Sequence, residues 1–237
     1  MLKQVFQQIS GLEIDSYIAL DFSAFVKIID VLGGVDVQVD QSFTDKLYPI
    51  DGNEKDLCGK KEEDMEELEK IATESPELAY PCRYETVSFS AGTNHLNGIQ
   101  ALKYARSRQA PEDGGDFARA KRQHKVIAAI KDKLLTPLMI PKLSSLMSQL
   151  ESEVQTDAEY QDIEKLLKQI PQANQYQITT IVLSTDNYLA SDHSTDGQYI
   201  LVPKKGKTNW TKVKKDIAKL SQGINLSPTP KPTSKPK

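Results

Sequence analysis

The stretch Ser88–Ile127, SFSAGTNHLNGIQALKYARSRQAPEDGGDFARAKRQHKVI, predicts a helix, a tight turn and a second helix. Apolar residues recur at helical intervals through Asn97–Arg108, which predicts a short helix. The pair Gly114-Gly115 then favours a turn, and a longer helix is predicted from Phe117 to about Leu135. Asp116 stands where the N-cap of that second helix is expected.

Four arginines flank the predicted turn, and they are Arg106, Arg108, Arg119 and Arg122. Guanidinium groups are planar, multi-donor forks that suit phosphate. Basic residues in the first turns of a helix also oppose its macrodipole unless an anion lies there. Residues two apart point about 200° from each other on a continuous helix. Arg106 and Arg108 can therefore converge on one ligand only if the helix ends at these residues and the chain then turns. The alternative is a structural ion-pair network with the nearby acids Glu112, Asp113 and Asp116. The residues alone leave both possibilities open.

The same motifs resemble a known family, the LytR-CpsA-Psr proteins. FSAGTNHLNGIQALKYARSR followed by GDFARAKRQHKVI resembles the C-terminal half of that domain, and IALDFSAFVKIIDVLGGVDVQV resembles its middle. The likeness runs in order over Leu2–Leu135 and continues more loosely to Trp210. Several separated motifs in one order make the resemblance specific.

The resemblance implies a membrane-anchored, Mg²⁺-dependent transferase on the extracytoplasmic face of the membrane or in the cell wall. Such a protein moves a glycopolymer, for example teichoic acid, capsule or another wall polysaccharide, from a polyprenyl-pyrophosphate carrier to peptidoglycan. In the family pattern both arginines of an R-x-R element bind the pyrophosphate, which implies this catalytic role for Arg106 and Arg108. The D-F-x-R element implies the same catalytic, pyrophosphate-binding role for Arg119, and the R-Q element implies that Gln123 is a further ligand. Asp116 belongs to the same binding site and positions the loop.

The family domain begins with an N-terminal portion that holds its acidic metal ligand and further basic motifs. This chain starts after those motifs, so we expect the Mg²⁺ ligands and the membrane anchor largely outside it, and we assign no metal ligand. The sequence is then a fragment of a longer protein or a degenerate member. A second hypothesis follows from the missing motifs: a non-catalytic protein that binds a polyprenyl phosphate or an anionic wall polymer.

The predicted elements upstream run strand, helix, strand. They are a buried strand over Ile14–Asp21, a helix capped by Asp21 or Ser23 that ends at Gly33-Gly34, and a half-buried strand over Val35–Val39. This order predicts the α/β (α+β) class. By resemblance, we expect a mixed central sheet flanked by helices in three layers, truncated on the N-terminal side.

In the family, the helix after Asp21 helps to wall an apolar channel for the prenyl chain. The candidates for that lipid pocket are Phe22, Phe25, Ile28 and Ile29. Ordinary core packing is the alternative for each of them.

We expect one partial domain over residues 1–225, with a charged surface insert at about 40–85 and a disordered tail rich in Pro and Lys over 226–237. Cys58 and Cys82 bracket the charged part of the insert and are a candidate disulfide, with two free thiols as the alternative. Neither has the Cys or His neighbours of a zinc site.

Composition excludes several other functions. The formal net charge of −3 argues against a general nucleic-acid binder. The sequence has no Gly-x-Ser-x-Gly, P-loop or HExxH motif, so it gives no support to a serine hydrolase, a P-loop nucleotide hydrolase or a zincin. No run reaches the ~18 consecutive apolar residues of a membrane-spanning helix.

Overall fold

The computed structural model describes residues 2–61, 68, 70–71, 79–136, 138–139, 145, 154–159, 162 and 181–223. The chain divides into two compact units. We call Leu20–Glu153 the arginine unit, and Met1–Ala19 together with Val154–Lys237 the terminal unit.

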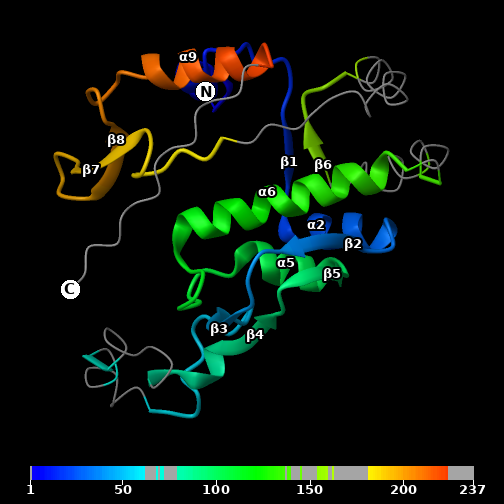
Figure 1. Ribbon diagram of the computed structural model, residues 1–237. Helices are drawn as coiled ribbons and strands as arrows, with labels where there is room; N and C mark the ends of the chain where they lie inside the picture. The colour runs from blue at the N-terminus through cyan, green and yellow to red at the C-terminus, as the bar shows by residue number, and fades with distance from the viewer. Residues whose placement is uncertain are drawn as a thin grey trace. The chain divides into compact units, whose positions relative to one another are not determined.

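The arginine unit contains the two helices α5 and α6 with the turn between them, and the strands that precede them (Figure 1). Its elements are α2 (Phe22–Val31), β2 (Val35–Val39), β3 (Phe43–Pro49), the 3₁₀ helix η2 (Pro81–Arg83), β4 (Tyr84–Phe89), β5 (Gly92–Leu96), α5 (Gly98–Arg106) and α6 (Gly115–Leu134). Helix α5 packs against both α2 and α6, and α6 also lies against β2. The core of the unit is formed by side chains of these helices and of β2, β3, β4 and β5.

Local sequence signals account for the first elements of this unit. Asp21 caps α2, because its Oδ1 accepts a hydrogen bond from the Ala24 amide at 2.7 Å. Val35, Val37 and Val39 are buried while the residues between them are exposed, which is the alternation predicted for β2. Both the cap and the half-buried strand are confirmed.

Helix α5 begins at a capping box in which Asn97 and Gln100 satisfy each other's backbone amides. It ends at Arg106, two residues before the predicted end at Arg108, because Ser107 leaves the helical conformation with ψ 133. The helix itself and the turn that follows it are confirmed. Helix α6 begins earlier than expected. Its N-cap is Gly114, and Asp116 lies in the first turn. The prediction of Asp116 as N-cap was wrong, because its carboxylate is engaged by arginines instead.

The described strands form two-stranded sheets, pairing β2 with β5, β3 with β4, β7 with β8 and β1 with β6. The mixed α/β class is therefore confirmed. A central sheet in three layers is not seen among these strands, each of which pairs with a single partner. Strand β1 spans only Ile18–Leu20 and is exposed throughout, so the prediction of a buried strand over Ile14–Asp21 was wrong.

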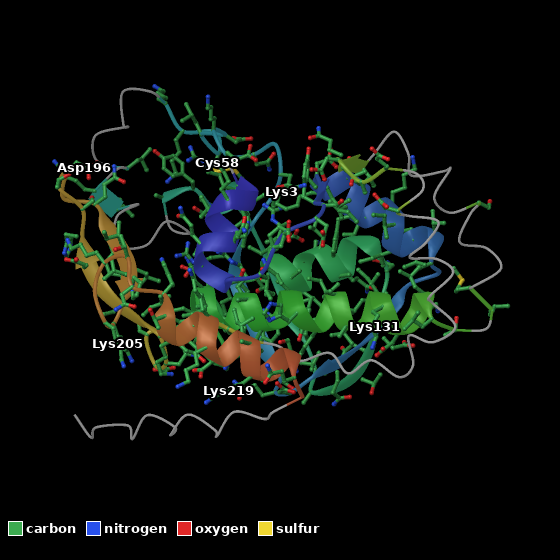
Figure 2. The ribbon with its side chains drawn as sticks, turned by 90° about the horizontal axis from the view of Figure 1, so that it is seen from above. Lys3, Cys58, Lys131, Asp196, Lys205 and Lys219 are labelled. Atoms are coloured by element: carbon green, nitrogen blue, oxygen red, sulfur yellow. A yellow bond between two sulfur atoms is a disulfide. The ribbon has the colours of Figure 1, made fainter. Side chains whose placement is uncertain are left out.

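The range expected as a surface insert contains a structured part and a disulfide-linked part. Strand β3 occupies its beginning and pairs antiparallel with β4. Further along, Cys58 and Cys82 are joined by a disulfide with an S–S length of 2.07 Å (Figure 2). The predicted surface helix between the cysteines lies mostly outside the described residues.

The terminal unit contains α1 (Leu2–Ser10), β6 (Val154–Thr156), β7 (Leu189–His193), β8 (Tyr199–Pro203) and α9 (Thr211–Ser221), with β1 at its boundary. Its core is formed by Tyr188, Leu189 and Val213, against which Trp210 packs. The tail expected over 226–237 lies outside the described residues. Among the described residues, no helix combines the length and apolar character needed to cross a membrane.

Candidate functional site

A cavity of about 550 Å³ in the arginine unit collects the predicted pyrophosphate ligands. Its lining residues are Phe22, Asp45, Leu47, Pro49, Tyr84, Arg106, Arg108, Gln109, Arg119 and Gln123. We call this cavity the arginine pocket. Because α5 ends at Arg106 and the chain turns, the two arginines of the R-x-R element face the same cavity as the arginine and glutamine of α6.

Arg106 is held at the pocket wall by two aromatic rings and one carboxylate. Its guanidinium carbon lies 4.3 Å from the Phe22 ring centroid and 5.6 Å from that of Tyr48. Its Nη1 donates to both oxygens of Asp51, at 2.9 and 3.1 Å. The Arg106 side chain is 22% exposed and that of Asp51 is 64% exposed. The pairing therefore takes place in a hydrated setting where ion pairs are weak.

Arg108 and Arg119 share a single carboxylate, that of Asp116. Arg108 Nη2 lies 3.1 Å from one Asp116 oxygen, and Arg119 Nη2 lies 2.8 Å from the other. One anion already bridges the two guanidinium groups, which shows that they can converge on a single anionic group. All three side chains are partly exposed, so each contact contributes about 0–1 kcal/mol and is readily exchanged.

Asp45 fixes the backbone that carries Arg108, and the sequence reasoning missed it. This carboxylate is only 1% exposed. It accepts hydrogen bonds from the Ser107 hydroxyl at 2.6 Å and from the amides of Arg108 at 2.8 Å, Gln109 at 3.0 Å and Leu47 at 3.0 Å. Burial is the largest single influence and would raise the pKa of Asp45, but these hydrogen bonds outweigh it, so the pKa lies below its ordinary value. Asp45 is therefore a charged anchor for the loop.

Arg122, the fourth arginine of the sequence cluster, does not line the pocket. Its side chain is 2% exposed and donates to the Asp113 carboxylate at 2.8 Å and carbonyl at 2.7 Å. It also donates to the Ser107 carbonyl, and its guanidinium lies 4.8 Å from the Phe43 ring centroid. The ion-pair alternative is thus the correct one for Arg122, which braces the loop from inside.

Gly114 lets the loop close tightly between the two helices. A Cβ at this position would lie 2.4 Å from the Ala110 carbonyl oxygen and 2.9 Å from that of Arg108. The next residue, Gly115, has φ +86 and donates its amide to the Arg108 carbonyl at 2.8 Å. Larger residues at Gly114 would move the backbone of Arg108.

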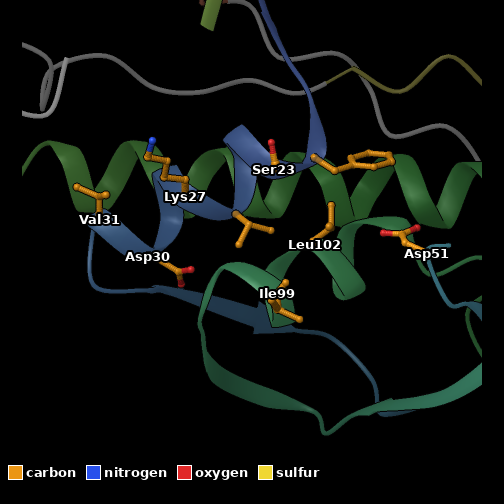
Figure 3. Close-up of a pocket in the computed structure, with 9 residues that line it drawn as sticks. Ser23, Lys27, Asp30, Val31, Asp51, Ile99 and Leu102 are labelled. Carbon is orange, nitrogen blue, oxygen red and sulfur yellow. The ribbon is translucent and has the colours of Figure 1, made fainter. Parts of the chain in front are cut away.

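A second cavity, of about 770 Å³, lies between α2 and α5 (Figure 3). Its lining residues are Phe22, Ser23, Val26, Lys27, Asp30, Val31, Asp51, Ile99 and Leu102. Of the four lipid-pocket candidates, only Phe22 lines it, and Phe22 also lines the arginine pocket. Ile29 is a fully buried core residue and Phe25 packs against that core, while Ile28 lines neither cavity. The two cavities therefore share Phe22 as a lining residue.

The carboxylates close to the arginine pocket do not form a Mg²⁺ site. Mg²⁺ prefers oxygen ligands in octahedral geometry. Asp45 is bound by four donors, and neither Asp51 nor Asp116 belongs to a group of three potential metal ligands among the described residues. Within the described part of the chain, the one metal-capable group of side chains is Asp56, Cys58 and Cys82, and its sulfurs are joined in the disulfide. The described residues therefore do not fit Mg²⁺.

Comparison with known proteins gives a consistent kinship. The model of the LytR_cpsA_psr family matches residues 1–216. The chain is 30% identical over 144 residues to the polyisoprenyl-teichoic acid–peptidoglycan teichoic acid transferase TagV of Bacillus subtilis, covering 61% of this chain and 28% of TagV. It is also 30% identical over 153 residues to biofilm regulatory protein A of Streptococcus mutans, covering 65% of this chain and 30% of that protein. The chain thus spans about three tenths of the length of these curated relatives.

Solved structures show the same fold. The crystal structure of Bacillus subtilis TagV superposes with a TM-score of 0.58 at 22% identity, covering 94% of this chain and 69% of that one. A Streptococcus agalactiae protein superposes with a TM-score of 0.61 at 22% identity, covering 97% of this chain and 64% of that one. With the family match over most of its length, the chain belongs to the LytR-CpsA-Psr family.

Proposed function

We propose that the arginine pocket binds the pyrophosphate of a polyprenyl-pyrophosphate-linked glycopolymer, and that the protein transfers this glycopolymer to peptidoglycan. The polymer is teichoic acid, capsule or another wall polysaccharide. The observation that carries the proposal is the convergence of Arg106, Arg108 and Arg119 on one cavity. Membership of the family and the transferase activity named for TagV support it.

The pocket supplies the donors that a pyrophosphate requires. Arg108 and Arg119 exchange Asp116 for phosphate oxygens, and Arg106 exchanges Asp51. Asp45 keeps the Arg108 backbone in place during this exchange, because it binds the backbone amides of Arg108 and Gln109 and not the guanidinium groups that bind the ligand. The prenyl chain leaves the pocket past Phe22 and lies against the apolar side chains of the second cavity, including Val26 and Leu102.

The reaction is a phosphoryl transfer. A hydroxyl of the acceptor attacks the phosphorus nearest the glycopolymer, forming a phosphodiester and releasing its proton. The bond from that phosphorus to the bridging oxygen breaks, and polyprenyl phosphate leaves. Negative charge grows on the bridging oxygen, where guanidinium donors stabilise it. The family implies Mg²⁺, but the described residues do not fit the ion, so the arginines alone are assigned roles in these steps.

A second candidate function is non-catalytic binding of a polyprenyl phosphate or of an anionic wall polymer. The observation in its favour is that the described residues supply anion donors without a Mg²⁺ ligand set. Incubation with polyprenyl-pyrophosphate glycopolymer and Mg²⁺ separates the two candidates. Bound lipid without turnover favours the second, and release of polyprenyl phosphate favours the first.

The test of the transferase is glycopolymer transfer by the complete protein with Arg106→Ala or Arg108→Ala. Removing one donor to a developing oxyanion costs about 2–4 kcal/mol in the transition state. Each variant should therefore abolish measurable transfer of labelled glycopolymer to peptidoglycan. Arg83→Ala is the matched control, because Arg83 stacks on Tyr80 and does not line the pocket. Normal transfer by both pocket variants would refute the assignment.

A further inference from the structure

Positive charge is concentrated near the C-terminal end of the chain. Residues 204–219 contain seven lysines and one aspartate, a net charge of +6. Since the whole chain carries −3, the remaining residues carry −9. A segment of this composition on an acidic protein indicates a local partner of opposite charge.

These lysines lie on the turn after β8 and on α9, and the two segments meet at Tyr188, whose carbonyl accepts the Lys204 amide at 2.9 Å and whose ring centroid lies 4.3 Å from Lys212 Nζ. We call this region the lysine surface and define it by Lys204, Lys205, Lys207, Lys212, Lys215 and Lys219. The last three lie on α9 at spacings of three and four residues, so they share a helix face. Val213 points to the opposite side, into the core. Figure 2 shows Lys205 and Lys219 projecting along the same border of this unit.

Acidic partners neutralise only part of this surface. Lys207 pairs with Asp192 at 2.8 Å and Lys212 with Asp216 at 3.1 Å. Across the described residues, Lys205, Lys215 and Lys219 have no salt bridge. Like charges at helical spacings of three and four repel one another. Asp216 attracts both Lys212 and Lys219 on this face, so an external anion would relieve mainly the repulsion that Lys215 meets.

We propose that the lysine surface binds a linear polyanion with a phosphate in each repeat, lying along α9 and the loop before it. Lysine ammonium groups are flexible point charges that track a mobile phosphate backbone without demanding one geometry. The proposal rests on the proposed function only for the source of the polymer. Under the proposed function, the lysine surface holds part of the glycopolymer itself and is a site separate from the arginine pocket.

The chemistry of the surface favours such a polymer over a bilayer or a nucleic acid. No large apolar side chain is exposed within residues 204–219, all of which the structure describes. Trp210 packs into the core of the unit. Insertion into a lipid surface needs an exposed apolar face, and stacking of nucleobases needs exposed aromatic rings. The lysine surface offers charge alone.

The test measures binding of lipid-free poly(glycerol phosphate) to the 237-residue chain by titration calorimetry. The variant replaces Lys205, Lys215 and Lys219 by Gln, the three lysines without a salt bridge. One lysine beside an anionic surface contributes roughly a fivefold factor in affinity at low salt. We expect the triple variant to bind at least roughly tenfold more weakly, and the wild-type affinity to fall as salt is raised.

Three controls separate this site from general charge, from misfolding and from the arginine pocket. Lys→Arg changes at the same three positions should retain binding. Gln at Lys46, Lys60 and Lys61, lysines of the arginine unit of which Lys60 is half-buried and the other two are exposed, should also leave it unchanged. The Gln variant at 205, 215 and 219 should keep the wild-type melting temperature and its affinity for farnesyl pyrophosphate.

Unchanged polymer binding by the triple Gln variant would overturn the proposal. So would an equal loss in the Lys46, Lys60 and Lys61 control, or binding of phosphatidylglycerol vesicles or single-stranded DNA in preference to the polymer. A failure of the proposed function leaves a different trace, because farnesyl pyrophosphate would then not bind while poly(glycerol phosphate) still did.

Discussion

Asp45 links the stability of the arginine loop to its charge. Its carboxylate is buried and satisfies three backbone amides and one hydroxyl, so removing the charge leaves buried donors without a full acceptor. Asp45→Asn should lower the free energy of unfolding by about 1–3 kcal/mol, the usual cost of orphaned buried groups. Urea denaturation of the two proteins measures this difference.

The same residue predicts a pH dependence of definite sign. The pKa of Asp45 is lowered in the folded protein, so its stabilisation is fully present above its unfolded value of about 3.9. It is lost as pH falls through the lower folded pKa. The stability gap between wild type and Asp45→Asn should therefore be constant near neutrality and shrink in acid. A gap that grows as pH falls would contradict the assigned sign.

Asp51 competes with an incoming anion for Arg106. The pair is exposed and contributes about 0–1 kcal/mol, so releasing Arg106 should tighten the binding of a phosphate ligand by up to about fivefold. We expect Asp51→Asn to lower the Kd for farnesyl pyrophosphate, measured by calorimetry. Weaker binding would mean instead that Asp51 orients Arg106 for the ligand.

Among single residues, the sequence identified the arginines but could not identify Asp45. The R-x-R and D-F-x-R motifs place Arg106, Arg108 and Arg119 by local spacing, and all three line one cavity. Asp45 lies in a range predicted as a charged insert, and its partners on the arginine loop are more than sixty residues away along the chain. The available signal was its inward position two residues after Phe43 in β3.

At the scale of elements, the disulfide-linked segment holds the loop that carries Asp51 against the residues just before β4. Cys58 and Cys82 enclose residues between β3 and β4, and Asn53 donates to the Cys82 carbonyl at 3.0 Å. Closing a loop of this length stabilises the folded state by about 3 kcal/mol in the chain-entropy model. The double change Cys58→Ser and Cys82→Ser should lower the free energy of unfolding by roughly that amount.

Thiol titration of the native wild-type protein supplies the matching check. A reagent that reacts with free thiols should detect none before reduction, because both sulfurs are joined. Two reactive thiols in the folded, unreduced protein would contradict the bond. The affinity of the double Ser variant for farnesyl pyrophosphate, compared with that of the wild type, then reports whether Asp51 still lies beside Arg106.

Helix ends were predictable where a local side chain decides them. Asp21 and Asn97 each cap the helix that follows by hydrogen bonds within three residues. The start of α6 was not predictable in the same way, because Asp116 is drawn to Arg108 and Arg119. Strand pairing could not be predicted from the sequence either, because β2 and β3 pair with strands that lie far along the chain.

At the scale of the whole molecule, the two units carry separate charge features. The arginine unit gathers guanidinium groups around one cavity, and the terminal unit carries the lysine surface. The concentration of positive charge near the C-terminal end can be read directly from the sequence, because seven lysines fall within residues 204–219. The sheet organisation is not, because periodicity marks a strand but not how many neighbours it will have.

The most direct measurement for the central claim is the affinity of the 237-residue chain for farnesyl pyrophosphate, with pocket arginines replaced one at a time. Charge-assisted hydrogen bonds contribute about 1.5–3 kcal/mol each, so Arg106→Ala, Arg108→Ala and Arg119→Ala should each weaken binding by roughly tenfold to a hundredfold. Arg83→Ala should bind like the wild type. If all three pocket variants bind as tightly as the wild type, the three arginines do not hold a pyrophosphate, and the account of this site is wrong.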